Sequence, residues 1–169
     1  MTLKKYLGIS AGFHDAAVSM IDSAGNILYA GHAERYSKRK NDAHLNDDIV
    51  SAALAHGTPD EVAYYERPWV KKIQQLYSGQ YSEAFDTNSF TLGQYLCKHL
   101  SPGQNLNTLL GVRHSYNNHH KSHAAAGFQT SPFEKATVVV IDAIGELDTI
   151  SMWGAEYDKH GQAVYKKLW

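Results

Sequence analysis

The chain has 169 residues, of which 43% are hydrophobic and 20% are charged, enough for one ordinary domain or two small lobes. Its 16 Lys and Arg against 17 Asp and Glu give a net charge of −1, which argues against a nucleic-acid surface. No apolar run approaches the roughly 20 residues of a membrane span, and the N-terminus is too polar for a secretory signal. The single cysteine, Cys97, excludes an internal disulfide and favours a reducing, cytoplasmic compartment.

The beginning of the chain predicts three antiparallel strands joined by short turns, at residues 6–10, 16–21 and 27–34. Gly25 and Asn26, which tolerate positive φ, mark the second turn. Asn46 as N-cap and Gly57 as stop signal then bracket a helix. After it we expect a strand at residues 61–65, helices at 70–85 and 90–100, and a strand at 109–114. A helix at 119–128 should follow, with Asn118 or Asn117 as its N-cap.

The last third of the chain repeats the opening pattern, with strands expected at residues 137–142, 148–157 and 163–168. Aligning residues 9–10 with 141–142 also aligns residues 18–20 with 150–152. Two copies of a three-stranded unit favour a duplicated α/β fold, although two unrelated hairpins of similar sequence remain the alternative. Nothing follows the third strand of the second copy, so we expect a truncated domain. Its exposed strands would invite pairing between chains, which makes a homo-oligomer an expected state.

Four of the ten histidines fall within residues 114–123. On a helix, His119 and His123 lie one turn apart on the same face, about 6 Å apart at Cβ. That spacing suits two ligands of one metal ion, although surface or core histidines would give the same pattern. Asp142 ends a strand of β-branched residues that we expect to be buried, and open α/β folds place ligand groups at such strand ends. A buried carboxylate there would be costly without a metal or a counter-charge, and an N-cap or turn acid is the alternative. Two histidines and a carboxylate suit non-haem iron(II), and zinc and manganese also accept them.

A second candidate site lies in the turn at residues 10–15. Small residues there, Gly12 among them, let backbone N–H groups approach an anion. His14 titrates near neutral pH and is suited to removing a proton from a hydroxyl. The basic run at residues 35–40, which ends in Lys40, would bind a phosphate or carboxylate if it lies beside this turn. An ordinary polar turn and a solvated loop are the alternatives.

Taken together, these segments resemble the O-carbamoyltransferases of the nodulation (NodU) and antibiotic-tailoring type. The resemblance rests on residues 6–17, 34–42, 119–125 and 140–146, and it spans essentially the whole chain. It implies an actin-like (ASKHA, Kae1-like) duplicated α/β fold, of which this chain holds the first lobe and the opening β-hairpins of the second. We expect residues 1–115 to form the first lobe, residues 116–135 the metal-motif helix and its connection, and residues 136–169 the start of the second lobe.

The resemblance also implies a chemistry. Members of this family make carbamoyl-adenylate from carbamoyl phosphate and ATP in a C-terminal YrdC-like domain. They then move the carbamoyl group to a hydroxyl of a sugar or antibiotic. By position, His119, His123 and Asp142 match the Fe²⁺ ligands and His14 the general base, while Gly12 and Lys40 are assigned to carbamoyl-adenylate.

The chain has no counterpart of the family's fourth ligand, an aspartate further along, nor of the YrdC-like domain. We therefore expect it to be inactive alone. A non-catalytic metal- or nucleotide-binding fragment, or an assembly module, is the alternative function.

Overall fold

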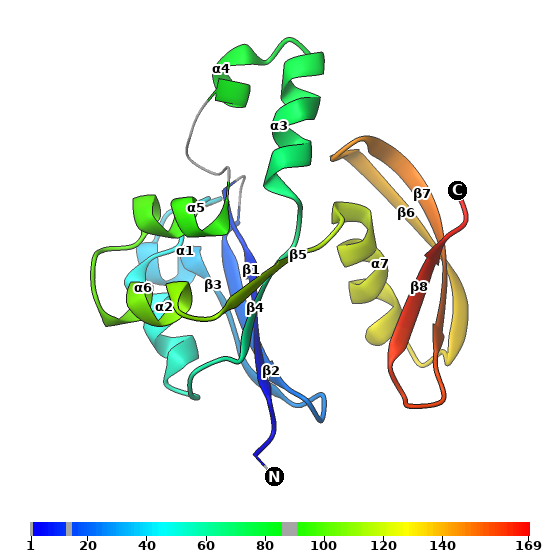
Figure 1. Ribbon diagram of the computed structural model, residues 1–169, viewed down its shortest axis with the longest axis horizontal. Helices are drawn as coiled ribbons and strands as arrows, with labels where there is room; N and C mark the ends of the chain where they lie inside the picture. Colours follow the sequence, from blue (N-terminus) through cyan, green and yellow to red (C-terminus); the bar gives the residue numbers. More distant parts are fainter. Residues whose placement is uncertain (1, 13–14, 86–90) are drawn as a thin grey trace.

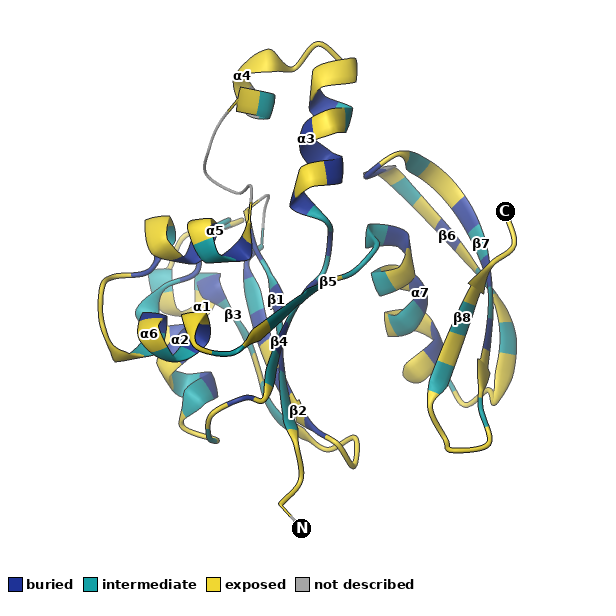
Figure 2. Ribbon diagram, viewed as in Figure 1, coloured by how far each residue is buried: buried dark blue, intermediate teal, exposed yellow. Residues whose placement is uncertain are grey.

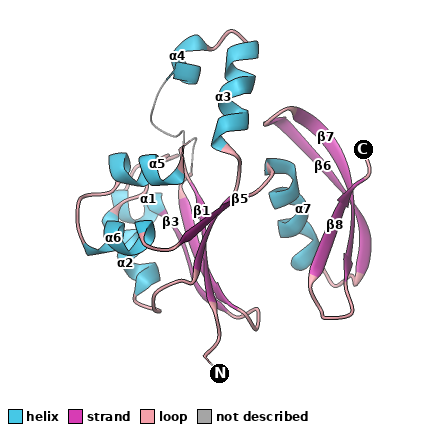
Figure 3. Cartoon of the chain, in the orientation of Figure 1, coloured by secondary structure: helices cyan, strands magenta, loops and turns pink. Residues whose placement is uncertain are grey.

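The computed structural model describes residues 2–12, 15–85 and 91–169, with the backbone alone described at Glu83 and Ile144. Its larger sheet has five strands in the order β3-β2-β1-β4-β5 (Figures 1 and 3). Strands β1 to β3 are antiparallel neighbours, whereas β4 and β5 run parallel to β1. The predicted α/β class is therefore confirmed. The five strands are β1 (Lys5–Ser10), β2 (Ala17–Asp22), β3 (Ile27–His32), β4 (Glu61–Tyr64) and β5 (Arg113–Tyr116).

The smaller sheet is an antiparallel meander of β6 (Lys135–Gly145), β7 (Asp148–Tyr157) and β8 (Ala163–Lys167). Its first hairpin repeats the strand register of the opening hairpin. In β1 and β2, Ile9 lies opposite Val18; in β6 and β7, Ile141 lies opposite Ile150. The residues that align in sequence are thus also paired in the same way in space.

The main core lies between one face of the large sheet and the helices that cover it (Figures 1 and 2). Alternate residues of β1, Leu7 and Ile9, point into this core, and helix α2 (Asp47–Leu54) contributes Ile49 and Val50. The predicted cap is present, because the Asn46 side chain accepts from the Ile49 N–H at 3.0 Å. Helices α5 (Leu92–His99) and α6 (Gln104–Leu110) complete the layer. The predicted start of α5 at Phe90 lies outside the described residues.

The predicted helix at residues 70–85 is wrong in one respect, because it is two helices. These are α3 (Pro68–Tyr77) and α4 (Tyr81–Phe85). Gly79 between them has a φ of +76°, a left-handed conformation that glycine adopts without a Cβ penalty. The Gln80 N–H donates to the Gln75 carbonyl at 2.9 Å, which closes the first helix.

Two further boundaries were wrong. Residues 104–110 form α6, and the strand begins only at Arg113, because Leu106 and Leu109 bury one helical face against the core. The strand predicted at residues 27–34 ends at His32. A short helix, α1 (Ala33–Ser37), follows and ends at Lys38, whose φ is +60°.

Helix α7 (His119–Gln129) packs on the small sheet and stands between the two sheets (Figure 1). Its Ala124 forms a small second core with Val140 and Trp153, and the Phe128 ring lies 5.1 Å from that of Tyr157. Helix α7 is thereby fixed against β6, the strand that carries Asp142. Within the described ranges, no helix has the length and apolar character needed to cross a membrane.

Candidate metal centre

The two histidines of the candidate centre lie at the start of helix α7. The Asn118 side chain caps this helix by accepting from the Lys121 N–H at 2.9 Å, so the helix begins at His119. One helical turn separates His119 from His123, and their Nε2 atoms are 3.1 Å apart. The helix therefore directs one nitrogen of each ring to the same point, as the sequence predicts.

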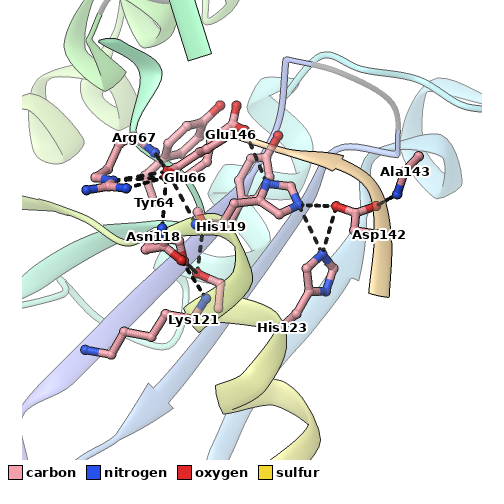
Figure 4. Close-up of polar contacts among 12 residues, drawn as sticks. Tyr64, Glu66, Arg67, Asn118, His119, Lys121, His123, Asp142, Ala143 and Glu146 are labelled. Atoms are coloured by element: carbon pink, nitrogen blue, oxygen red, sulfur yellow. Dashed lines mark hydrogen bonds and ion pairs between the residues drawn. The ribbon is translucent and has the colours of Figure 1, made fainter. Parts of the chain in front are cut away.

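Asp142 reaches this point from strand β6 (Figure 4). Its Oδ2 atom lies 2.9 Å from His119 Nε2 and 3.8 Å from His123 Nε2. One ligand atom from each residue thus falls within 4.8 Å of the other two. Two imidazole nitrogens and one carboxylate oxygen are a donor set that divalent first-row metals accept. The His119 side chain is 12% exposed and that of His123 is 55% exposed, so solvent reaches one side of the centre.

The expectation that Asp142 ends a buried strand was wrong. Strand β6 continues to Gly145, and the Asp142 side chain is 29% exposed. Neighbouring Val139 and Ile141 are 54% and 76% exposed, because α7 covers only the other face of β6. The case for Asp142 as a ligand therefore rests on its distances to the two imidazoles and not on the cost of burying it.

The charges at the centre shift one another's pKa values. Burial lowers the pKa of His119, but its hydrogen bond to Glu66 and the charges of Glu66 and Asp142 outweigh this and raise it above 6.5. Burial and the charge of His119 lower the pKa of His123. Burial opposes ionisation of Asp142, yet the Ala143 N–H and both imidazoles hold its pKa below 3.8. The carboxylate is therefore ionised at neutral pH and available to a cation.

A buried carboxylate, Glu146, connects this centre to Arg67, which follows strand β4 of the large sheet. Its side chain is 2% exposed and forms an ion pair with Arg67 through two of the guanidinium nitrogens. It also accepts from the Arg67 N–H at 2.9 Å, the Asn118 side chain at 3.0 Å and the His119 N–H at 3.3 Å. The turn after β6, the start of α7 and the start of α3 are held together by this one side chain. Glu146 takes a φ of +54° to do so.

Gly145 leaves room for the histidines. A Cβ there would lie 2.4 Å from His120 Cδ2 and 2.8 Å from His119 Cδ2, closer than side chains tolerate. His120 is buried, and its Nδ1 lies 2.7 Å from the Ser151 hydroxyl. It is therefore a core residue of α7 rather than a member of the metal centre.

The second candidate site, in the turn at residues 10–15, is only partly covered by the residues that the structure describes. His14 lies outside the described residues. Gly12 has a φ of +94°, and a Cβ there would approach the rings of Tyr64 and Tyr95. Its N–H donates to the Ala43 carbonyl at 2.8 Å, so this N–H is already occupied. Lys40 is exposed in the same loop that Ala43 closes against the turn. The segment that follows the basic run therefore lies against the described part of this turn, and the contact of Lys40 with the donor stays a prediction.

A cavity of about 1000 Å³ lies between the small-residue face of the large sheet and the pair α7 and β8. Its polar wall includes His32, Arg35, Asn117 and Lys121, and none of the three candidate ligands lines it.

A second group, Asp15, His32 and Glu34, also has one ligand atom of each residue within 4.8 Å of the others. Glu34 there already accepts from the Asn41 N–H at 3.4 Å and pairs with Arg35. The first centre therefore has the more available donors.

The sequence did not indicate a functional role for two acidic residues at the centre, Glu66 and Glu146. Glu66 lies against His119, and Glu146 clamps the start of α7. Glu66 follows β4, a parallel strand, at its carboxyl end, so the topological argument that selected Asp142 would also have selected Glu66. Nothing local to the sequence signals the burial of Glu146.

The protein thus has an α/β fold in which helix α7 supplies two imidazoles and strand β6 supplies one carboxylate to the same point. The chain belongs to the family described as carbamoyltransferase N-terminus, which it matches over residues 5–165. It is also similar to "Uncharacterized protein sll1178" of Synechocystis sp. (strain ATCC 27184 / PCC 6803 / Kazusa). The two are 28% identical over 167 residues, which cover 89% of this chain and 27% of that relative. The chain thus spans about a quarter of that relative's length.

Proposed function

We propose that this chain forms the metal-binding part of an O-carbamoyltransferase. The reaction would move a carbamoyl group from carbamoyl-adenylate to a hydroxyl of a sugar or antibiotic. The observation that carries the proposal is the convergence of His119 Nε2, His123 Nε2 and Asp142 Oδ2 within 4.8 Å, in a chain that belongs to a carbamoyltransferase family. Family membership supplies the reaction class, and the resemblance described above supplies donor and acceptor.

These three residues fit a divalent cation, Fe²⁺ by resemblance. The donor atoms converge, the carboxylate is ionised, and the exposed flank of His123 leaves room for further ligands. When bound, the cation supplies a Lewis acid next to the reacting group. The helix α7 contributes by holding both imidazoles one turn apart, and the Glu146 clamp keeps α7 in register with β6.

In the transfer step, His14 takes the proton of the acceptor hydroxyl as general base. The hydroxyl oxygen then forms a bond to the carbamoyl carbon, and the bond from that carbon to the adenylate phosphate breaks. AMP leaves with the bonding electrons, and the proton stays on the imidazole until solvent removes it. Lys40 would neutralise the leaving phosphate, and Gly12, whose φ of +94° favours glycine, would shape the turn beside the donor.

For the fold we propose the actin-like, Kae1-like architecture, with residues 1–115, 116–135 and 136–169 as first lobe, metal-motif segment and start of a second lobe. Two observations support it. The large sheet has an antiparallel meander followed by two parallel strands. The opening hairpins of both sheets pair equivalent residues, Ile9 with Val18 and Ile141 with Ile150.

The test supplies carbamoyl-adenylate and a panel of hydroxyl acceptors, and detects carbamoylated product by mass. A longer enzyme that contains this segment should yield product, and His119→Ala or Asp142→Ala should abolish it. The 169-residue chain alone should yield none, because the centre is open to water on the side of His123. An intact longer enzyme without any transfer would refute the proposed reaction, and turnover by the short chain would refute its inactivity.

A further inference from the structure

Glu66 lies beyond the His119 ring, on the side away from the candidate cation site (Figure 4). Its Oε2 atom is 3.4 Å from His119 Nδ1, while Nε2 of the same ring is 2.9 Å from Asp142. The imidazole therefore has a carboxylate at each nitrogen. Only the nitrogen that faces Asp142 also faces His123, so the two carboxylates cannot have the same role.

The backbone around Glu66 is anchored on both sides. The Tyr65 N–H donates to the Ile9 carbonyl at 3.3 Å, and the Tyr65 carbonyl accepts from the Ser122 hydroxyl at 2.7 Å. On the other side, the Arg67 N–H donates to Glu146 at 2.9 Å. Because Ser122 belongs to α7 and Glu146 bonds its first residue, Glu66 is held at a fixed place relative to His119.

The Glu66 side chain is also well shielded from water. It is 8% exposed, and a buried carboxylate is costly unless donors satisfy it. The Tyr65 ring lies 5.4 Å from the His119 ring at 63°, so the imidazole is held by an aromatic edge contact as well as by Glu66. Such an environment fixes the plane of the His119 ring.

We propose that Glu66 is a positioning residue for the metal centre. Its carboxylate accepts the Nδ1 proton of His119 and thereby presents Nε2, as a bare and more basic nitrogen, to the cation. Carboxylate–histidine–metal arrangements fix the tautomer and orientation of the ligand in this way. The inference rests on the proposed function, because it assigns Glu66 a role toward the cation that His119 would bind.

The first arm of the test needs no metal. Nitrogen NMR of ¹⁵N-histidine-labelled, metal-free protein at alkaline pH reports which ring nitrogen of His119 carries a proton. Because Asp142 competes for the ring proton at Nε2 when no cation is bound, the measurement is made on Asp142→Ala protein. We expect a proton on Nδ1 there, and a shift of the proton toward Nε2 when Glu66→Leu is added. A bare Nδ1 in folded Asp142→Ala protein would overturn the proposal.

The second arm titrates the wild type and its Glu66 variants, all with Asp142 intact, with Co²⁺ alone and follows the absorption bands of the ion. We expect Glu66→Leu to weaken Co²⁺ binding about 10–100-fold. Glu66→Gln should lose less, because its amide oxygen can accept the same proton. Glu61→Gln is the matched control, because Glu61 begins the strand that leads to Glu66 and should leave affinity unchanged. Circular dichroism checks that each variant is folded.

The outcomes separate the two claims. Equal Co²⁺ binding by wild type and His119→Ala would refute the metal centre, and the NMR arm would still decide the Glu66 contact. If Co²⁺ binding depends on His119 while a folded Glu66→Leu protein keeps full affinity, the positioning role is wrong and the metal centre stands.

Discussion

Asp142 Oδ2 lies 2.9 Å from His119 Nε2, although one residue belongs to a strand and the other to a helix. The two elements meet because α7 packs its Ala124 against Val140 of β6, two residues before Asp142. The ends of both elements are then tied together by Glu146. The centre is thus a consequence of packing between α7 and the small sheet. Changes to that packing should therefore affect metal affinity before they affect the fold.

Metal affinity should depend on pH through His119. Its pKa is raised above 6.5 by Glu66 and Asp142, despite burial. A histidine binds metal only after losing its proton, so protons compete as the pH falls through that raised value. Below it, Co²⁺ affinity should drop about tenfold per pH unit. Co²⁺ titrations across a pH series measure this, and an affinity that stays constant from pH 8 to about pH 5 would exclude His119 as a ligand.

Removing Glu146 should destabilise the fold. In Glu146→Ala, the Arg67 guanidinium and three N–H donors lose a buried acceptor. The Arg67 side chain is 35% exposed and stays partly solvated, so the full penalty of an unpaired buried charge does not apply. The donors that lose their buried acceptor should cost about 1–3 kcal/mol in the free energy of unfolding. Urea denaturation followed by circular dichroism measures it.

The matched control is Glu156→Ala, which breaks an exposed ion pair with Lys135. That change should cost about 0–1 kcal/mol. Equal losses in Glu146→Ala and Glu156→Ala would mean that the contacts of Glu146 stabilise the fold no more than an exposed ion pair does.

Gly145→Ala should weaken metal binding. The new methyl group would lie 2.4 Å from His120 Cδ2 and 2.8 Å from His119 Cδ2, so the rings must move. We expect about a 10–100-fold loss of Co²⁺ affinity, since displaced ligands bind poorly. Gly127→Ala on the same helix is the control, because its Cβ would lie 4.0 Å from the nearest atom, in Val138. An unchanged affinity in Gly145→Ala would show that the position of the His119 ring does not govern binding.

His14→Asn should slow carbamoyl transfer in a longer enzyme that contains this segment. General base catalysis contributes about 10²–10⁴-fold, and asparagine cannot take the hydroxyl proton. Formation of carbamoyl-adenylate from carbamoyl phosphate and ATP should continue, because by resemblance it belongs to another domain. Mass spectrometry of both products separates the steps. If the two steps fell equally, His14 would have a role in folding or binding.

Sequence patterns predicted most of the elements for physical reasons that the structure makes visible. Strand-like runs joined by short turns predicted β1 and β2, and the structure buries alternate residues of both strands. Caps located α2 and α7, since Asn46 and Asn118 satisfy local N–H groups. Helix α6 was missed because its short apolar spacing, Leu106 and Leu109, adjoins a strand.

The candidate centre was predictable in part. The helical spacing of His119 and His123 is a local property, so the sequence sufficed to pair them. The contacts of Glu66 and Glu146 depend on how β4, α7 and the β6–β7 turn pack in three dimensions. The residues they contact are 53 and 27 positions away along the chain, beyond any local pattern.

The most direct test of the central claim is a Co²⁺ titration of the metal-free chain beside its His119→Ala variant. The wild type should bind one Co²⁺ per chain, because His119, His123 and Asp142 converge on one point. His119→Ala should lose that binding, and His160→Ala should keep it, because His160 lies exposed in the turn between β7 and β8. If wild type and His119→Ala bind the same amount of Co²⁺ with the same affinity, the three residues are not a metal centre.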